Sequence, residues 1–214
     1  METVAVIDFE TTGIAPGQGA RATEIAAVLL REGEIVGRFQ SLMNSGAWIA
    51  PFIESLTGIS NAMVAAASPA RAVIREVVPF TRGCQTVAQN ASFDRSFWLA
   101  EAAAAGCEPD PAHRFACTML LARRVYPQAP NRKRGTLAAL NQLPDNGRAH
   151  RALADAMTAA QLWMKLQRDL QERGSARLAL THERMCELQR TARGGTDRWL
   201  RQGAGRAVVP RRMV

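Results

Sequence analysis

The chain has 214 residues, of which 47% are hydrophobic and 21% charged, with 27 Lys and Arg against 19 Asp and Glu. This composition is typical of a soluble globular protein and excludes a disordered tract, and no apolar run reaches the ~18 residues that a transmembrane helix needs. The apolar segment 3–7 is short and has no basic leader before it, unlike a secretory signal. We therefore expect a cytoplasmic protein with no membrane partner.

Most of the net charge of +8 lies near the C-terminus. Residues 1–164 hold 15 basic and 14 acidic side chains, whereas residues 165–214 hold 12 basic and 5 acidic ones. A basic segment beside a nearly neutral body indicates contact with a polyanion such as nucleic acid, although a solvated helix explains the charge equally well. We expect a domain over 1–173 and a basic, partly helical extension over 174–214 whose end is mobile.

The elements expected in chain order begin with strands and then alternate. Strands are expected over 3–8, 24–31, 34–42, 84–89 and 115–117, with a turn at 32–33 between the second and third. A short helix should open at Pro51, and further helices are expected over 69–80, 93–105, 118–126, 136–141, 150–172 and 178–191. This order predicts an α/β fold with a mixed five-stranded sheet flanked by helices.

Asp8 and Glu10 lie two residues apart at the end of the first strand, so both carboxylates should face the same side of the sheet. Two neighbouring anions raise each other's pKa unless a cation compensates them, and no Lys or Arg occurs in residues 1–20. A hard divalent cation such as Mg²⁺ or Mn²⁺ is the simplest compensator. The alternative is that one or both acids point into water at the strand end.

Three more polar residues suggest acid–base chemistry. Asp155 interrupts an apolar helical segment, although Asp is a poor residue for a helix interior, and His150 precedes it by five residues. Asp94 in a first helical turn is explained by the helix dipole alone, but it follows the fourth strand closely and would approach Asp8 if the two strands are neighbours. A lone histidine at a helix start and a solvent-facing acid remain the alternative.

Three segments together resemble the successive motifs of the DEDDh (DnaQ-like) 3′–5′ exonucleases, a family that includes the proofreading epsilon subunit of bacterial DNA polymerase III. They are residues 8–13 (DFETTG), 89–94 (QNASFD) and 150–156 (HRALADA). Their order, their intervals and the histidine five residues before the last aspartate all match, and the resemblance extends over about residues 2–172. It implies a ribonuclease H-like sheet.

The resemblance also implies roles for individual residues. Asp8, Glu10, Asp94 and Asp155 would bind two Mg²⁺ or Mn²⁺ ions, and neutral His150 would accept a proton from the attacking water. Residues at the positions of Phe9, Thr11, Thr12 and Thr57 would contact the terminal nucleotide. Asn90 would help to hold the loop of the active site. The expected reaction releases nucleoside 5′-monophosphates from a single-stranded 3′ end.

Several points stay open at this stage. DNA is favoured as the substrate, with short RNA as the alternative, and a noncatalytic subunit that holds a polymerase is a further alternative. Thr57 occupies a position where the epsilon-like group usually has histidine, which puts that contact in doubt. The basic run 132–134 is explained by a solvated loop, but next to a nucleic-acid site it could contact phosphates. The oligomeric state is not predicted.

Overall fold

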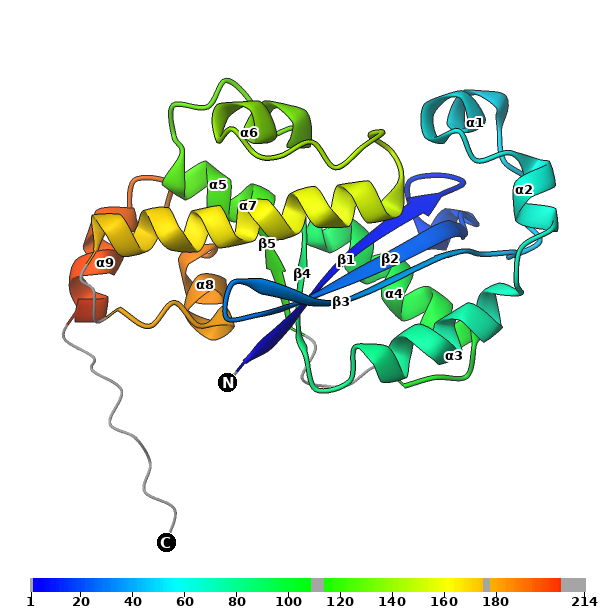
Figure 1. The fold of residues 1–214 in the computed structure, drawn as a ribbon, viewed down its shortest axis with the longest axis horizontal. Helices are drawn as coiled ribbons and strands as arrows, with labels where there is room; N and C mark the ends of the chain where they lie inside the picture. The colour runs from blue at the N-terminus through cyan, green and yellow to red at the C-terminus, as the bar shows by residue number, and fades with distance from the viewer. Residues whose placement is uncertain (1, 109–113, 175–177, 205–214) are drawn as a thin grey trace, which may run out of the picture.

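A computed structural model describes residues 2–108, 114–174 and 178–204. Its centre is one five-stranded sheet with the strand order β3-β2-β1-β4-β5 (Figure 1). The strands are β1 (Thr3–Thr11), β2 (Ala22–Arg31), β3 (Glu34–Leu42), β4 (Gln85–Ala88) and β5 (Phe115–Cys117). β2 pairs antiparallel with β1 and β3, and β4 pairs parallel with β1 and β5. The mixed sheet confirms the predicted fold class.

Helices flank the sheet on both faces. They are α1 (Pro51–Thr57), α2 (Asn61–Ala65), α3 (Ala70–Phe80), α4 (Ala91–Ala104), α5 (Thr118–Val125), α6 (Arg134–Leu140), α7 (Ala152–Arg173), α8 (His182–Leu188) and α9 (Thr196–Ala204), with a 3₁₀ turn over Pro16–Gln18. α2 and α9 were not expected, and α6 begins two residues earlier than predicted. α2 forms because Ser60 caps it and accepts a hydrogen bond from the Met63 backbone N–H at 3.1 Å.

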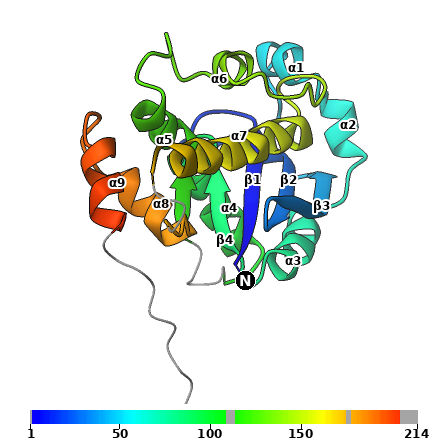
Figure 2. The same ribbon diagram turned by 60° about the vertical axis from the view of Figure 1, so that its left-hand side comes forward.

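The two faces of β1 pack against different helices, as Figure 2 shows. Val4 and Val6 belong to a core with α5 and α7, whereas Ile7 and Phe9 belong to a core with α3 and α4. Because side chains alternate along a strand, Asp8 and Glu10 lie on the α7 side. The spacing of the two acids therefore predicted their shared face correctly.

The helices after Gly174 pack on the body of the protein. The Gln189 side chain accepts from the Cys117 backbone N–H at 2.7 Å and donates to the Phe115 carbonyl at 3.3 Å, so it occupies the open edge of β5. Trp199 and Leu200 of α9 are buried in the α7-side core. The division at residue 174 stays a prediction, and residues 205–214 of the end that was expected to be mobile lie outside the described ranges.

The cysteines and the histidines outside the three motifs can also be described. All four cysteines are free thiols, and Cys107 is only partly buried. His182 is buried, and its ring lies 2.8 Å from the Thr86 carbonyl, so it is a satisfied core histidine. His113 lies outside the described residues. Within the described ranges, none of the helices combines the length and the apolarity that a membrane span requires.

Candidate active site

Four carboxylates from three separate parts of the chain meet at one end of the sheet. Asp8 and Glu10 lie on β1, and Asp94 and Asp155 lie in the first turns of α4 and α7. They are 7%, 8%, 3% and 2% exposed, respectively. Buried acids are rare unless they are paired or bind a cation, so their presence together requires an explanation.

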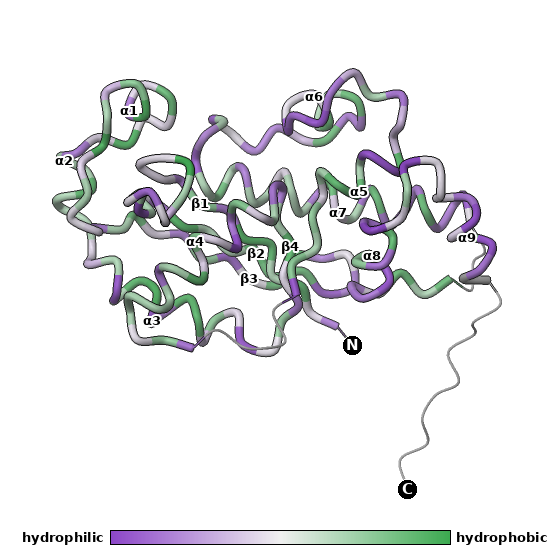
Figure 3. The backbone as a smooth tube through the Cα atoms, turned by 180° about the vertical axis from the view of Figure 1, so that it is seen from behind, coloured by the Kyte–Doolittle hydropathy of each residue, from purple (hydrophilic) through white to green (hydrophobic). Residues whose placement is uncertain are grey.

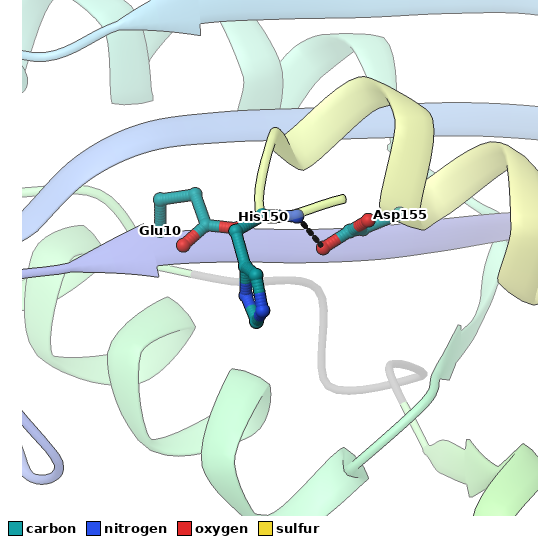
Figure 4. Close-up of side chains that lie close together, drawn as sticks. All are labelled: Glu10, His150 and Asp155. Atoms are coloured by element: carbon teal, nitrogen blue, oxygen red, sulfur yellow. Dashed lines mark hydrogen bonds between the residues drawn. The ribbon is translucent and has the colours of Figure 1, made fainter. Parts of the chain in front are cut away.

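His150 joins this cluster through its backbone as well as its ring. Its N–H donates to Asp155 Oδ2 at 3.1 Å, as Figure 4 shows. A φ of +61° makes this possible, a left-handed conformation that is uncommon for residues other than glycine and that concentrates at functional sites. Potential ligand atoms of Glu10, His150 and Asp155 lie within 4.8 Å of one another, close enough to bind one metal ion.

Asp94 reaches the cluster because β4 pairs parallel with β1, which brings the segment after β4 to the end of β1. Its Oδ1 accepts the backbone N–H of Phe9 at 3.2 Å. This hydrogen bond connects the start of α4 to the strand residue that lies between Asp8 and Glu10. Asp94 therefore has a fixed position relative to both acids.

The cluster is strongly perturbed electrostatically. Burial, followed by repulsion from the other acids, raises the pKa of Asp8 well above its usual range. Burial also raises the pKa of Glu10 to about 8, of Asp94 to about 7 and of Asp155 to about 6. Burial lowers the pKa of His150, and nearby arginines lower it further. The site therefore favours a neutral His150 imidazole. The raised pKa values of the acids indicate that the cluster holds too little positive charge to compensate four carboxylates.

Arg134 supplies part of that positive charge, although a solvated loop was the simpler explanation of the basic run 132–134. Its guanidinium forms an ion pair with Asp155, and the Arg134 side chain is only 20% exposed. The difference arises because α6 starts at Arg134, which turns this side chain toward α7. A basic run in a loop gives no sign of which acid each of its charges will meet, so the sequence offered no signal for this contact.

A second arginine positions the start of α7. Arg151 donates through Nε and Nη2 to the two carboxylate oxygens of Glu24, at 3.1 and 2.8 Å, and the backbone N–H of Ala152 donates to the same group at 2.9 Å. Glu24 lies on β2 directly opposite Glu10. This arrangement, called the Glu24 clamp below, connects the helix that carries Asp155 to the strand next to β1.

The residues predicted to contact substrate occupy different positions. Phe9 is 4% exposed, and its ring lies in the core against Phe97. Thr11 lines the cleft, but its hydroxyl donates to the Gly13 carbonyl at 2.6 Å. The Thr12 hydroxyl accepts the Arg21 backbone N–H at 3.0 Å, and Thr12 is not among the cleft-lining residues.

Thr57 and Asn90 both line the cleft. The Thr57 hydroxyl donates to the Ile53 carbonyl at 2.9 Å and accepts the Ile59 backbone N–H at 3.1 Å, so it is engaged at the end of α1. Asn90 precedes α4 as its N-terminal cap residue, and its side chain accepts from the Ser92 hydroxyl at 3.2 Å. All five substrate contacts stay predictions.

The acids line a cleft of about 320 Å³ between the end of β1, α1 and the start of α7. Its rim is apolar and exposed, with Ile14, Phe52 and Leu56 at 76%, 69% and 47%. A second groove of about 880 Å³ adjoins it along α6 and shares Arg134 and the start of α7 with the cleft. The segments on both sides of α6 are hydrophilic, as Figure 3 shows.

Known proteins of similar sequence or structure identify the family. The family profile described as RNase_T: Exonuclease matches residues 5–163. The 3′-5′ exonuclease DinG of Bacillus subtilis (strain 168) is 36% identical over 167 residues, and a DNA polymerase III PolC-type of Caldanaerobacter subterraneus is 34% identical over 169. These matches span 78% and 79% of this chain but only 18% and 12% of those relatives.

A solved structure of Exonuclease X, in complex with 5′ overhanging duplex DNA, is similar over nearly its full length. It is 29% identical, has a TM-score of 0.65, and the match covers 87% of this chain and 99% of that one. Residues 5–163, which the family profile matches, include all three motifs and every acid of the cluster. The chain belongs to the exonuclease family, in its DEDDh (DnaQ-like) branch, as the motifs predicted.

Proposed function

We propose that the chain is a metal-dependent 3′–5′ exonuclease that removes nucleoside 5′-monophosphates from single-stranded DNA ends. The observation that carries this proposal is the convergence of Asp8, Glu10, Asp94 and Asp155 with His150 in one cleft. Four buried carboxylates with raised pKa values make a set of hard oxygen ligands whose negative charge Arg134 compensates only in part. A divalent cation fits this donor set.

The four carboxylates would hold two Mg²⁺ or Mn²⁺ ions, which supply positive charge to the attacking water and to the leaving 3′-oxygen. The chain's own contribution is to orient the reacting groups and to accept a proton. His150 is neutral at pH 7 because its pKa is lowered, so its imidazole can take the proton of the water. Such help is worth roughly 10²- to 10⁴-fold in rate.

DNA is the favoured substrate because the similar Exonuclease X was solved with DNA, and short RNA is the alternative. The exposed apolar rim of the cleft suits unstacked bases, which every single strand offers. A polymerase partner is part of the proposal because a PolC-type polymerase is among the relatives.

The test uses matched DNA and RNA oligonucleotides labelled at the 5′ end, with Mg²⁺ or with excess EDTA. We expect stepwise shortening of DNA from the 3′ end, abolished by EDTA and by Asp8→Ala. Glu34→Ala is the matched control, because Glu34 is an exposed acid at the far end of β3. Activity that survives both EDTA and Asp8→Ala would contradict the metal mechanism, and cleavage of RNA alone would contradict the DNA assignment.

A further inference from the structure

Arg134 lies where a metal ion would compete with it. Its guanidinium pairs through Nη1 with Asp155 Oδ2, the same oxygen that accepts the His150 backbone N–H at 3.1 Å. Asp155, His150 and Glu10 are also the residues whose ligand atoms lie within 4.8 Å of one another. The guanidinium therefore contacts an oxygen of the very group that could bind an ion.

The charge of Arg134 acts on the whole cluster. It lowers the pKa of Asp8, Glu10, Asp94 and Asp155, in each case against the larger effect of burial. Among the described residues that line the cleft, only Arg134 and His150 are basic. One guanidinium cannot neutralise four carboxylates, and a divalent ion bound beside it would be repelled by its charge.

The position of Arg134 in the chain leaves it a second place to go. It is the first residue of α6, a helix of seven residues, and Gly135 follows it. Arg134 lines both the cleft and the adjoining groove of about 880 Å³. A change of rotamer could therefore carry the guanidinium into that groove without unfolding an element.

We propose that Arg134 is an exchangeable counter-cation: it holds Asp155 while no metal is bound and releases that carboxylate when a divalent cation enters. This inference rests on the proposed function, because it assumes that the acidic cluster binds metal. This role belongs to the metal-free protein, because a purely structural ion pair would also persist when metal is bound.

The exchange predicts opposite effects of Arg134→Gln with and without metal. In EDTA the variant loses the cation of the cluster, and its melting temperature should fall by about 2–6 °C. Mn²⁺ no longer has to displace an ion pair, so the variant should bind it about threefold to thirtyfold more tightly than wild type. Saturating Mn²⁺ should therefore close most of the gap in melting temperature.

The experiment titrates wild type, Arg134→Gln and Lys133→Gln with Mn²⁺, following free Mn²⁺ by electron paramagnetic resonance, and records melting curves in EDTA and in Mn²⁺. Lys133→Gln is the matched control, because it removes the same charge from an exposed residue. Lys133 lines the groove but not the cleft.

Tighter Mn²⁺ binding by Arg134→Gln, with Lys133→Gln near wild type, supports the exchange. Equal or weaker binding by Arg134→Gln, or the same loss of melting temperature in EDTA and in Mn²⁺, overturns it. A wild-type protein that binds no Mn²⁺ would contradict the proposed function itself, and the wild-type titration thereby separates the two failures.

Discussion

Breaking the Glu24 clamp should damage the site and the fold together. Arg151→Gln removes the charged partner of Glu24, whose side chain is 1% exposed. Loss of one partner of a buried ion pair costs about 3–5 kcal/mol. The Arg151 side chain is 32% exposed, and Glu24 keeps the hydrogen bonds from Gln40 and Ala152, so we expect about 2–3 kcal/mol after these are discounted.

For a chain of this length, that loss corresponds to a fall of roughly 5–10 °C in melting temperature. Activity should fall as well, because Arg151 follows His150 and precedes α7, which carries Asp155. A misplacement of ~1 Å at an active site can cost up to ~10²-fold in rate. We therefore expect kcat to fall about tenfold to a hundredfold at a temperature well below both melting points.

The chain offers a matched control for this variant. Arg21 clamps Glu101 with Nε and Nη2 at 2.9 and 2.8 Å, and the Ala22 backbone N–H donates to Glu101 at 3.0 Å. The exposure of the two side chains, 36% and 2%, is also similar. This clamp connects the start of β2 to Glu101 of α4, seven residues after Asp94, and its hydrogen bonds and ion pair join only Arg21, Ala22 and Glu101 among the described residues. Arg21→Gln should lose similar stability in urea unfolding but much less activity, and equal activity losses in the two variants would refute the positioning argument.

Three further predictions concern pH and the C-terminal helices. Burial raises the pKa of Glu10 to about 8 and of Asp155 to about 6, so the folded metal-free protein holds protons that the unfolded chain releases. Its stability in EDTA should therefore fall as pH rises from about 5 to 8.5, and saturating Mg²⁺ should remove most of that fall in melting curves. Because the pKa of His150 is lowered, the single-turnover rate should rise with pH below about 6.5 and then level off. His150→Gln should remove that rise without abolishing metal binding. A chain that ends at Gly174 should expose the core that α8 and α9 cover, so its melting temperature should be lower than that of a chain ending at Ala204. Equal melting curves would show that the domain ends at Gly174.

The sequence predicted the sheet and the proximity of the five groups because most of these signals were local. Asp8 and Glu10 share a strand, whose period of two fixes their common face. Asp155 and His150 lie on one short segment, so their proximity did not depend on the rest of the fold. Only Asp94 needed tertiary information, namely that β1 and β4 are neighbours, and the parallel pairing of those strands provides it.

The contacts that the sequence did not predict depend on long-range packing. Glu24 and Arg151 are 127 positions apart, and neither residue type nor spacing relates them. Arg134 pairs with Asp155 only because α6 begins at Arg134 and lies next to the start of α7. α9 was not expected because Gly194 and Gly195, directly before it, are poor helix formers, whereas burial of Trp199 and Leu200 offsets the weak local preference for a helix.

The two halves of the acidic site are held in place by different kinds of contact. Asp8 and Glu10 are held by the antiparallel ladder between β1 and β2, while the parallel pairing of β1 with β4 covers residues 4–6. The start of α7 has no such ladder, and it depends on the Glu24 clamp and on the ion pair with Arg134. Both are charged side-chain contacts, and a metal ion would compete directly with the second. The half of the site that carries His150 and Asp155 should therefore be the half that moves when metal binds, while β1 stays fixed.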